Sequence, residues 1–190
     1  MYNSFKIVCN ITMTKLVSRK PIFKADLFTV FEDSVELLNS EKRTYHSVKR
    51  NAAVSVVPLT SDNQVYLIKQ YRHMYERWML EAIAGMIDPG EDPLTTAKRE
   101  LKEESGLEAK EWKQLGVVHA AGSIVTWDHF TFMAKGITEG ESRLEASEQI
   151  ELVKMPLEEA VEKVMNGEIT TSGSIANILM LHQLLITGKL

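Results

Sequence analysis

The sequence predicts an α/β (α+β) fold in which helices pack on a mixed β-sheet and a small antiparallel β arm comes first. Three observations predict this order. Short β-prone runs separated by turn residues fill the first half of the chain, a well-capped helix follows Pro89-Gly90, and two more helical segments end the chain. We expect residues 1–50 to form an N-terminal extension and the arm, and residues 51–190 to form the main domain.

The arm is expected to be entirely β. Its runs at 27–31, 35–38 and 44–48 are rich in β-prone residues, and Asp33 is expected to lie in a turn between the first two. So few strands cannot bury their own apolar face, and we therefore expect a homodimer. Residues before Met13, an alternative start, are expected to be unstructured.

The main domain is expected to start with a hairpin. The continuous apolar run 52–58 is typical of a buried strand, residues 61–64 have the composition of a turn, and residues 65–71 supply the second strand. Residues 78–83 predict another strand, which ends at Gly85. Three later strands are expected at 112–118, 130–135 and 150–155.

Three helices are expected in this domain. The first has Asp92 as its N-cap, Pro93 in its first turn and Gly106 just past its end. The other two are expected at 157–165 and from just after Ser172 through Leu185, the last with an apolar stripe that faces the core.

The composition argues against several classes of protein. The formal net charge of −4 is unlike the basic surface of a general nucleic-acid-binding protein, and no segment reaches the ~18 apolar residues that cross a bilayer. We therefore expect neither nucleic acid nor membrane as a partner. Cys9 is the only cysteine, which excludes an internal disulfide and fits a reducing, cytoplasmic compartment.

Three carboxylates lie together on the first helix. Glu100, Glu103 and Glu104 are spaced i, i+3 and i+4, which puts them on one helical face. Like charges at this spacing destabilise an isolated helix by about 0.2–0.5 kcal/mol per pair. A hard divalent cation such as Mg²⁺ prefers these oxygen ligands and shares its coordination shell with substrate phosphate. For the triplet alone, a solvated acidic face is the alternative.

The 23 residues from Gly85 to Leu107 resemble the Nudix box, Gly-x5-Glu-x7-Arg-Glu-U-x-Glu-Glu-x-Gly-U, in which U is a bulky aliphatic residue. The nine specified positions are all filled, by Gly85, Glu91, Arg99, Glu100, Leu101, Glu103, Glu104, Gly106 and Leu107. The resemblance implies a Nudix hydrolase: an α/β/α sandwich that cleaves a nucleoside diphosphate linked to another group, with Mg²⁺, or alternatively Mn²⁺, as cofactor.

The resemblance also implies roles for single residues. Glu100 and Glu104 would be the principal metal ligands, Glu103 a ligand or the catalytic base, and the carbonyl of Ala84 a further ligand. Arg99 would hold the glutamates in position. The metal would polarise phosphoryl oxygens and lower the pKa of the attacking water.

The similarity continues into the ADP-ribose pyrophosphatase branch of this family, through Gln70-Tyr71-Arg72, residues 80–91, and Gly167-Glu168-Ile169 followed by Ser174-Ile175-Ala176. Enzymes of this branch exchange an extra N-terminal sheet between the subunits of a homodimer, and the arm is similar to that sheet.

Arg72 and Glu81 are the substrate-binding candidates that this branch implies. Arg72 would contact the pyrophosphate, because a guanidinium fork pairs bidentately with phosphate, and Glu81 would lie in the substrate pocket. An ordinary surface position is the alternative for each. The candidates for an aromatic sandwich around adenine are Phe23, Phe28, Tyr71 and Trp78.

A late loop carries the expected catalytic base in this branch, and residues 145–151 occupy that place. Glu148 is the first choice and Glu145 the second. A solvated acidic loop is the alternative.

The loop at residues 119–129 departs from the branch pattern. It contains no proline, and Trp127 stands near the place of the usual acidic residue. This departure puts the identity of the sugar in question but leaves the reaction class intact. His119 and His129 are candidate phosphate or sugar contacts.

The expected function is hydrolysis of the pyrophosphate of ADP-ribose or a related nucleoside diphosphate sugar, which yields a nucleoside monophosphate and a sugar phosphate. One alternative is another Nudix substrate, such as GDP-mannose, a different sugar nucleotide or NADH. The other is a non-hydrolytic module that senses ADP-ribose.

Overall fold

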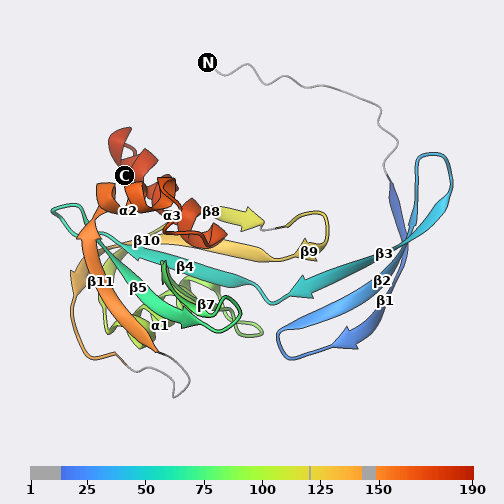
Figure 1. Cartoon of the computed structure of the whole chain (residues 1–190), viewed down its shortest axis with the longest axis horizontal. Coiled ribbons are helices and arrows are strands. Elements are labelled where there is room, and N and C mark those ends of the chain that lie inside the picture. The colour runs from blue at the N-terminus through green and yellow to red at the C-terminus, as the bar shows by residue number, and fades with distance from the viewer. Residues whose placement is uncertain (1–13, 120, 143–148) are drawn as a thin grey trace. The chain divides into compact units, whose positions relative to one another are not determined.

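A computed structural model describes residues 14–119, 121–142 and 149–190 (Figure 1). Its contacts divide the chain into two compact units, which are residues 1–50 with Ser123–Thr126, and residues 51–122 with 127–190. Within the described ranges, none of the helices is long and apolar enough to span a membrane.

The smaller unit is one sheet with strand order β1-β2-β3-β9. Its strands are β1 (Lys15–Lys24), β2 (Phe28–Glu36), β3 (Lys42–Arg50) and β9 (Val125–Thr126). The first three are antiparallel, and β9 is parallel to β3. The sequence predicted neither β1 nor β9. β1 is exposed along its whole length and lacks a regular apolar alternation, and β9 is only two residues long.

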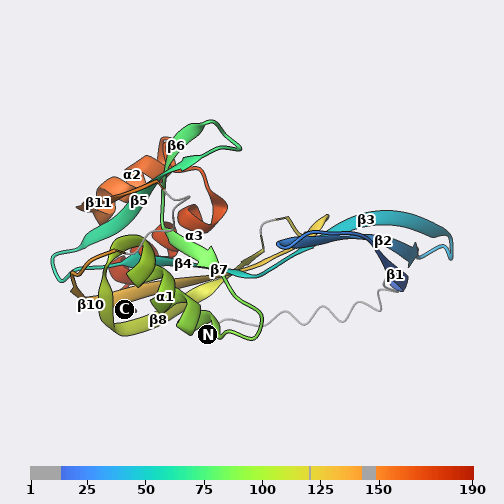
Figure 2. The same cartoon turned by 90° about the horizontal axis from the view of Figure 1, so that it is seen from below.

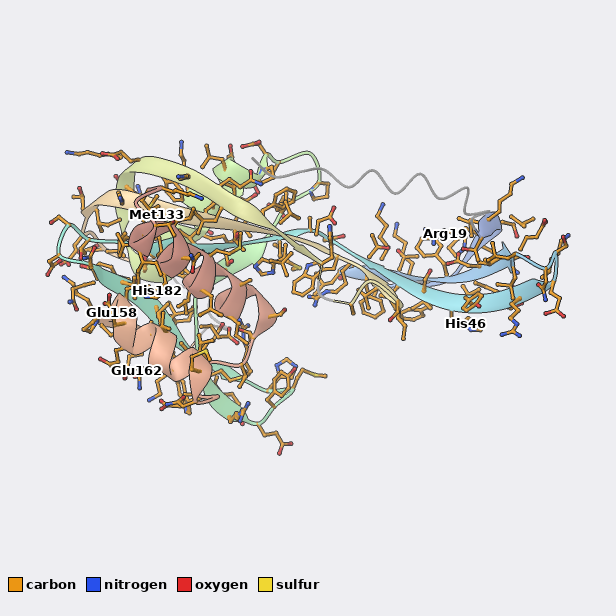
Figure 3. The ribbon with its side chains drawn as sticks, turned by 90° about the horizontal axis from the view of Figure 1, so that it is seen from above. Arg19, His46, Met133, Glu158, Glu162 and His182 are labelled. Atoms are coloured by element: carbon orange, nitrogen blue, oxygen red, sulfur yellow. The ribbon has the colours of Figure 1, made fainter. Side chains whose placement is uncertain are left out.

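Asp33 is not in a turn, and the prediction of one there is wrong. It lies within the continuous strand β2, is 4% exposed and pairs with Arg19 across the sheet. Nε and Nη2 of Arg19 donate to the two carboxylate oxygens at 2.7 and 2.9 Å, and the Ser47 hydroxyl donates at 2.6 Å. Arg19 and His46 project from opposite faces of this sheet (Figure 3).

The larger unit contains two sheets, with strand orders β7-β4-β10-β8 and β11-β5-β6. Their strands are β4 (Ala53–Pro58), β5 (Gln64–Arg72), β6 (Arg77–Glu81), β7 (Ile83–Met86), β8 (Glu108–His119), β10 (Asp128–Thr138) and β11 (Ile150–Pro156). β10 runs parallel to β4 and antiparallel to β8, so the sheet is mixed, as predicted.

Three helices cover the sheets of the larger unit: α1 (Pro93–Ser105), α2 (Leu157–Met165) and α3 (Ser172–Ile186). Ala97 and Leu101 of α1 pack in one apolar cluster, and Ala160 and Ile178 of α2 and α3 pack in another. The helices therefore lie on opposite sides of the sheets (Figure 2), and the predicted α/β/α arrangement is confirmed.

Local signals at both ends determine the limits of α1. Oδ2 of Asp92 accepts hydrogen bonds from the backbone N–H groups of Leu94 and Thr95, so it satisfies two donors that have no partner inside the helix. Gly106 ends the helix with φ +71°, a left-handed conformation that favours glycine. Both caps confirm the sequence prediction.

The expected single strand at 78–83 is two strands in two different sheets. β6 pairs with β5, whereas β7 pairs with β4. Between them, the backbone N–H of Ala82 donates at 2.9 Å to the Ser174 hydroxyl of α3 instead of to a neighbouring strand. Glu81 and Ala84, on either side of this break, consequently belong to different sheets.

Candidate active site

The carboxylates of α1 lie where the helix meets the sheet. Ala97 and Leu101 pack into the core, and Glu100 and Glu104 lie on the side of α1 that faces β7. Glu100 and Glu104 are 9% and 5% exposed, whereas nearly half of the Glu103 side chain is exposed. Two of the three predicted carboxylate ligands are therefore almost buried.

Arg99 lies between these carboxylates. Its Nη1 donates to Glu100 at 2.7 Å and to Glu103 at 3.0 Å, while its Nη2 donates to Glu91 at 3.1 Å and to the Met86 carbonyl at 3.2 Å. One guanidinium thus connects three glutamates of the Nudix box with the backbone at the end of β7.

Arg99 and Glu91 stabilise each other's charged form. The hydrogen bond from Arg99, followed by the one from the Thr96 hydroxyl, holds the pKa of Glu91 below its usual value. The hydrogen bond with Glu91 likewise raises the pKa of Arg99. The pair therefore stays ionised around neutral pH.

The backbone of β7 touches two of the carboxylates directly. The Ala84 N–H donates to Oε2 of Glu104 at 3.0 Å. At Gly85, a Cβ atom would overlap the carboxylate of Glu100, so only glycine allows this approach. The contacts explain why a glycine is needed at the first position of the box.

The donor set fits a hard divalent cation. Glu91, Glu100 and Glu103 contact the Arg99 guanidinium, and Glu104 accepts from the backbone of β7, so these five side chains carry a formal charge of −3. Oxygen donors with excess negative charge are the ligands that Mg²⁺ and Mn²⁺ prefer. Within the described part of the chain, no three His, Cys, Asp or Glu side chains converge in metal-binding geometry. The assignment of the ligands therefore stays a prediction.

Arg72 and Glu81 pair with each other on the side of the sheets that faces α1. Nε and Nη2 of Arg72 donate to Oε2 of Glu81 at 3.0 and 2.5 Å. The Glu81 side chain is 4% exposed and that of Arg72 is 38% exposed. Glu81 lies opposite Ile68, which packs with Leu101 of α1, so this ion pair and the carboxylates share one side of the sheets.

Tyr71 and Trp78 lie on the other face of the same hairpin. They are directly opposite each other, with ring centroids 5.9 Å apart and edge-to-face, and they continue the face on which Leu67 packs in the other cluster. The structure thus does not bring them to the Arg72–Glu81 pair, and their role in substrate binding stays a prediction. Phe23 and Phe28 pack against each other at 5.9 Å in the smaller unit.

The remaining candidates are placed as follows. Glu145 and Glu148 lie outside the described residues. Nδ1 of His119 is 3.1 Å from Asp128 on the surface. His129 is buried, packs edge-on against Trp127, and occupies the space that a Cβ of Gly173 would need.

Sequence reasoning missed two supporting residues. The Thr96 hydroxyl donates to Glu91 at 2.7 Å, and the Ser174 hydroxyl accepts the Ala82 N–H. Ser174 belongs to the tail motif of the branch, but the motif does not indicate its contact with Ala82. That contact joins residues 92 positions apart, which no local pattern reveals.

Comparisons with known proteins agree with this site. A model of the NUDIX domain matches residues 49–171. The chain is 32% identical to an ADP-ribose pyrophosphatase of Mycobacterium tuberculosis over 87% of this chain and 82% of that protein. It is 28% identical to a methanol dehydrogenase activator of Bacillus methanolicus, over 88% and 92%.

A solved structure shares the fold. The crystal structure of an ADP compounds hydrolase superposes with a TM-score of 0.82 at 24% identity and covers 96% of this chain and all of that one. Nudix hydrolases generally need a divalent metal, in keeping with the carboxylate cluster on α1. With a family match over most of the chain and all nine positions of the box filled, the chain belongs to the Nudix family.

Proposed function

We propose that the chain hydrolyses the pyrophosphate bond of ADP-ribose or a related nucleoside diphosphate sugar and releases a nucleoside monophosphate and a sugar phosphate. The observation that carries this proposal is the presence of two complementary groups on one side of the sheets. One is the acidic cluster on α1, and the other is the Arg72–Glu81 pair. Two relatives at 29% and 32% identity bear the name ADP-ribose pyrophosphatase, which supports the choice of substrate.

In this proposal, Glu100, Glu103, Glu104 and the carbonyl of Ala84 hold Mg²⁺ or Mn²⁺. The bound cation supplies Lewis-acid chemistry, because it polarises phosphoryl oxygens and lowers the pKa of a bound water. Arg99 keeps Glu100 and Glu103 in position through its Nη1.

Arg72 is proposed to bind the diphosphate. Glu81 accepts hydrogen bonds from Nε–H and from one Nη2–H of Arg72. Nη1 and the second Nη2–H therefore remain to donate to phosphate oxygens in a fixed direction. Glu81 is then a positioning residue that acts through Arg72.

The base that activates the water is proposed to be Glu148, with Glu145 and Glu103 as alternatives. Glu103 is the most exposed of the three α1 carboxylates, so solvent reaches it most easily.

We also propose a homodimer. Every residue of β1 is exposed, including Leu16, Val17, Ile22 and Phe23 at 45–56%. The smaller unit has nine Lys and Arg against five Asp and Glu, whereas the larger unit has 13 against 21. Charge complementarity therefore favours the larger unit of a second copy as the surface that covers the arm. Light scattering should give twice the chain mass of 21.5 kDa, and a monomer at micromolar concentration would contradict the proposal.

A panel of substrates tests the reaction. ADP-ribose, ADP-sugars, GDP-mannose and NADH are incubated with Mg²⁺ or Mn²⁺, and the nucleoside monophosphate is measured by chromatography. We expect the highest kcat/KM on an ADP-linked sugar. The loop at 119–129 makes another sugar nucleotide the second candidate, since it departs from the branch. Binding of ADP-ribose without turnover of any compound would instead indicate a sensing module.

A further inference from the structure

Gln70 is a buried polar residue beside the Arg72–Glu81 pair. It lies on the same face of β5 as Ile68 and Arg72, is 9% exposed, and its Oε1 has no hydrogen-bond partner among the described residues. Exposure increases along this face from the fully buried Ile68 to the partly exposed Arg72. Gln70 therefore marks the boundary between the core and the candidate substrate site.

Among the described residues, the cross-strand neighbours of Gln70 do not satisfy this acceptor. The residues directly opposite it are Met79 in β6 and Ile150 in β11, and neither side chain has a donor. The Glu81 carboxylate accepts but does not donate, and Arg72 directs Nε and one Nη2 proton at Glu81 and, in the proposed function, uses its other donors for the diphosphate. A buried acceptor without a partner lowers stability, so a ligand that donates to Oε1 would remove this cost.

The chemistry of the missing donor restricts the ligand. Ionised phosphate oxygens only accept hydrogen bonds, so they suit Arg72 but not Oε1 of Gln70. A sugar hydroxyl can donate. Residues i and i+2 of a strand are separated by about 6.6 Å, which is close to the distance from a phosphate to a hydroxyl of the sugar attached to it. Arg72 and Gln70 are thus spaced to contact a phosphate and its sugar.

We propose that Oε1 of Gln70 accepts a hydrogen bond from a hydroxyl of one of the two sugars attached to the diphosphate. The enzyme would therefore prefer a substrate with this hydroxyl to the analogue that lacks it. This inference rests on the proposed function, because it assumes that Arg72 binds the diphosphate of a nucleotide sugar.

The experiment compares Gln70→Met with the wild type on the best substrate of the panel and on analogues that each lack one sugar hydroxyl. Methionine is similar in size to glutamine but lacks the strong amide acceptor. The wild type should lose at least about tenfold in kcat/KM on one deoxy analogue, since a site built to bind a hydroxyl rejects the analogue without it. Gln70→Met should lose a similar factor on the parent substrate and no longer distinguish the two.

Gln64→Met is the matched control, because Gln64 lies on the same strand and face at the far end from Arg72. It should keep the wild-type discrimination. Gln70→Met should also melt at the same or a higher temperature, because it removes an unsatisfied buried acceptor. A structural role for Gln70 would lower the melting temperature instead.

The outcomes separate the two proposals. No turnover of any nucleotide sugar by the wild type would overturn the proposed function. Turnover in which Gln70→Met keeps the wild-type preference, or in which the wild type has no preference for the hydroxyl, would overturn the role of Gln70 alone.

Discussion

Arg99 and Arg72 use the guanidinium group in two different ways. Arg99 is surrounded by glutamates and by the Met86 carbonyl, so its donors are directed at protein atoms. Arg72 is held by the single carboxylate of Glu81 and keeps donors for a ligand. We therefore expect Arg99 to position the carboxylates and Arg72 to bind substrate.

Arg72→Lys tests this difference. Lysine keeps the charge but loses the planar fork that binds phosphate and Glu81 bidentately. We expect kcat/KM on the preferred substrate to fall about 10- to 100-fold, mainly through KM, which is about 1.4–2.7 kcal/mol of transition-state binding. Arg43→Lys, on β3, is the control and should leave the kinetics unchanged. Wild-type KM in Arg72→Lys would exclude Arg72 from the substrate site.

Residues whose partners are local were predictable, and residues with distant partners were not. Asp92 and Gly106 cap a helix through neighbours in sequence, so their roles were read correctly. Asp33 has the composition of a turn residue, but Arg19 and Ser47, each 14 residues away, hold it within a strand. Ion pairing across a sheet overrode the local preference.

At the scale of elements, a hydrogen bond to α3 stabilises the break between β6 and β7. The Ser174 hydroxyl takes the N–H of Ala82, the residue at which the chain leaves one sheet for the other. This break places Glu81 beside Arg72 and Ala84 beside Glu104. A strand prediction from the sequence alone could not find it, because the contact that causes it lies on a helix near the end of the chain.

Ser174→Ala should destabilise the larger unit. It leaves the buried N–H of Ala82 without an acceptor, at a cost of about 1–3 kcal/mol in the free energy of unfolding. Urea denaturation followed by tryptophan fluorescence measures the change. Ser172→Ala, at an exposed position of the same helix, should change stability by less than about 0.5 kcal/mol. Equal stability of the two variants would show that the hydrogen bond of Ser174 is not needed.

The stability of the arm sheet against urea should depend on pH through Asp33. Hydrogen bonds from Arg19 and then Ser47 lower the pKa of Asp33 in the folded state. This stabilisation is present above the unfolded pKa of about 3.9 and is lost as the pH falls through the lower, folded value. Urea denaturation between pH 2 and 6 should therefore show a decline in acid that is weaker in Asp33→Asn. Parallel curves would contradict the assignment.

For the whole molecule, the sequence predicted the layers and the location of the chemistry better than the shape of the substrate site. The box at 85–107 is continuous in sequence, so the resemblance it carries implied the three-layer arrangement, and local caps predicted α1. The sequence did not predict which side chains lie on each face of the β5–β6 hairpin. Tyr71 is adjacent to Arg72 in sequence, yet alternation along the strand puts the two side chains on opposite faces.

The charge of the molecule is divided unequally between the units. The larger unit carries the acidic excess, part of which is the cluster on α1, whereas the arm is basic. A net charge of −4 for the whole chain therefore hides both the proposed metal site and the proposed contact between copies.

The most direct test of the central claim is the rate of nucleoside monophosphate release from ADP-ribose as a function of Mg²⁺ concentration, in the wild type, Glu104→Gln and Glu108→Gln. Glu108 lies just past α1 and pairs with Lys102, so it is a matched control. We predict saturable activation by Mg²⁺ in the wild type and in Glu108→Gln, loss of activity on chelation, and a fall in rate of at least about 100-fold in Glu104→Gln. Near wild-type activity in Glu104→Gln, or a rate that does not depend on the metal, would contradict the account.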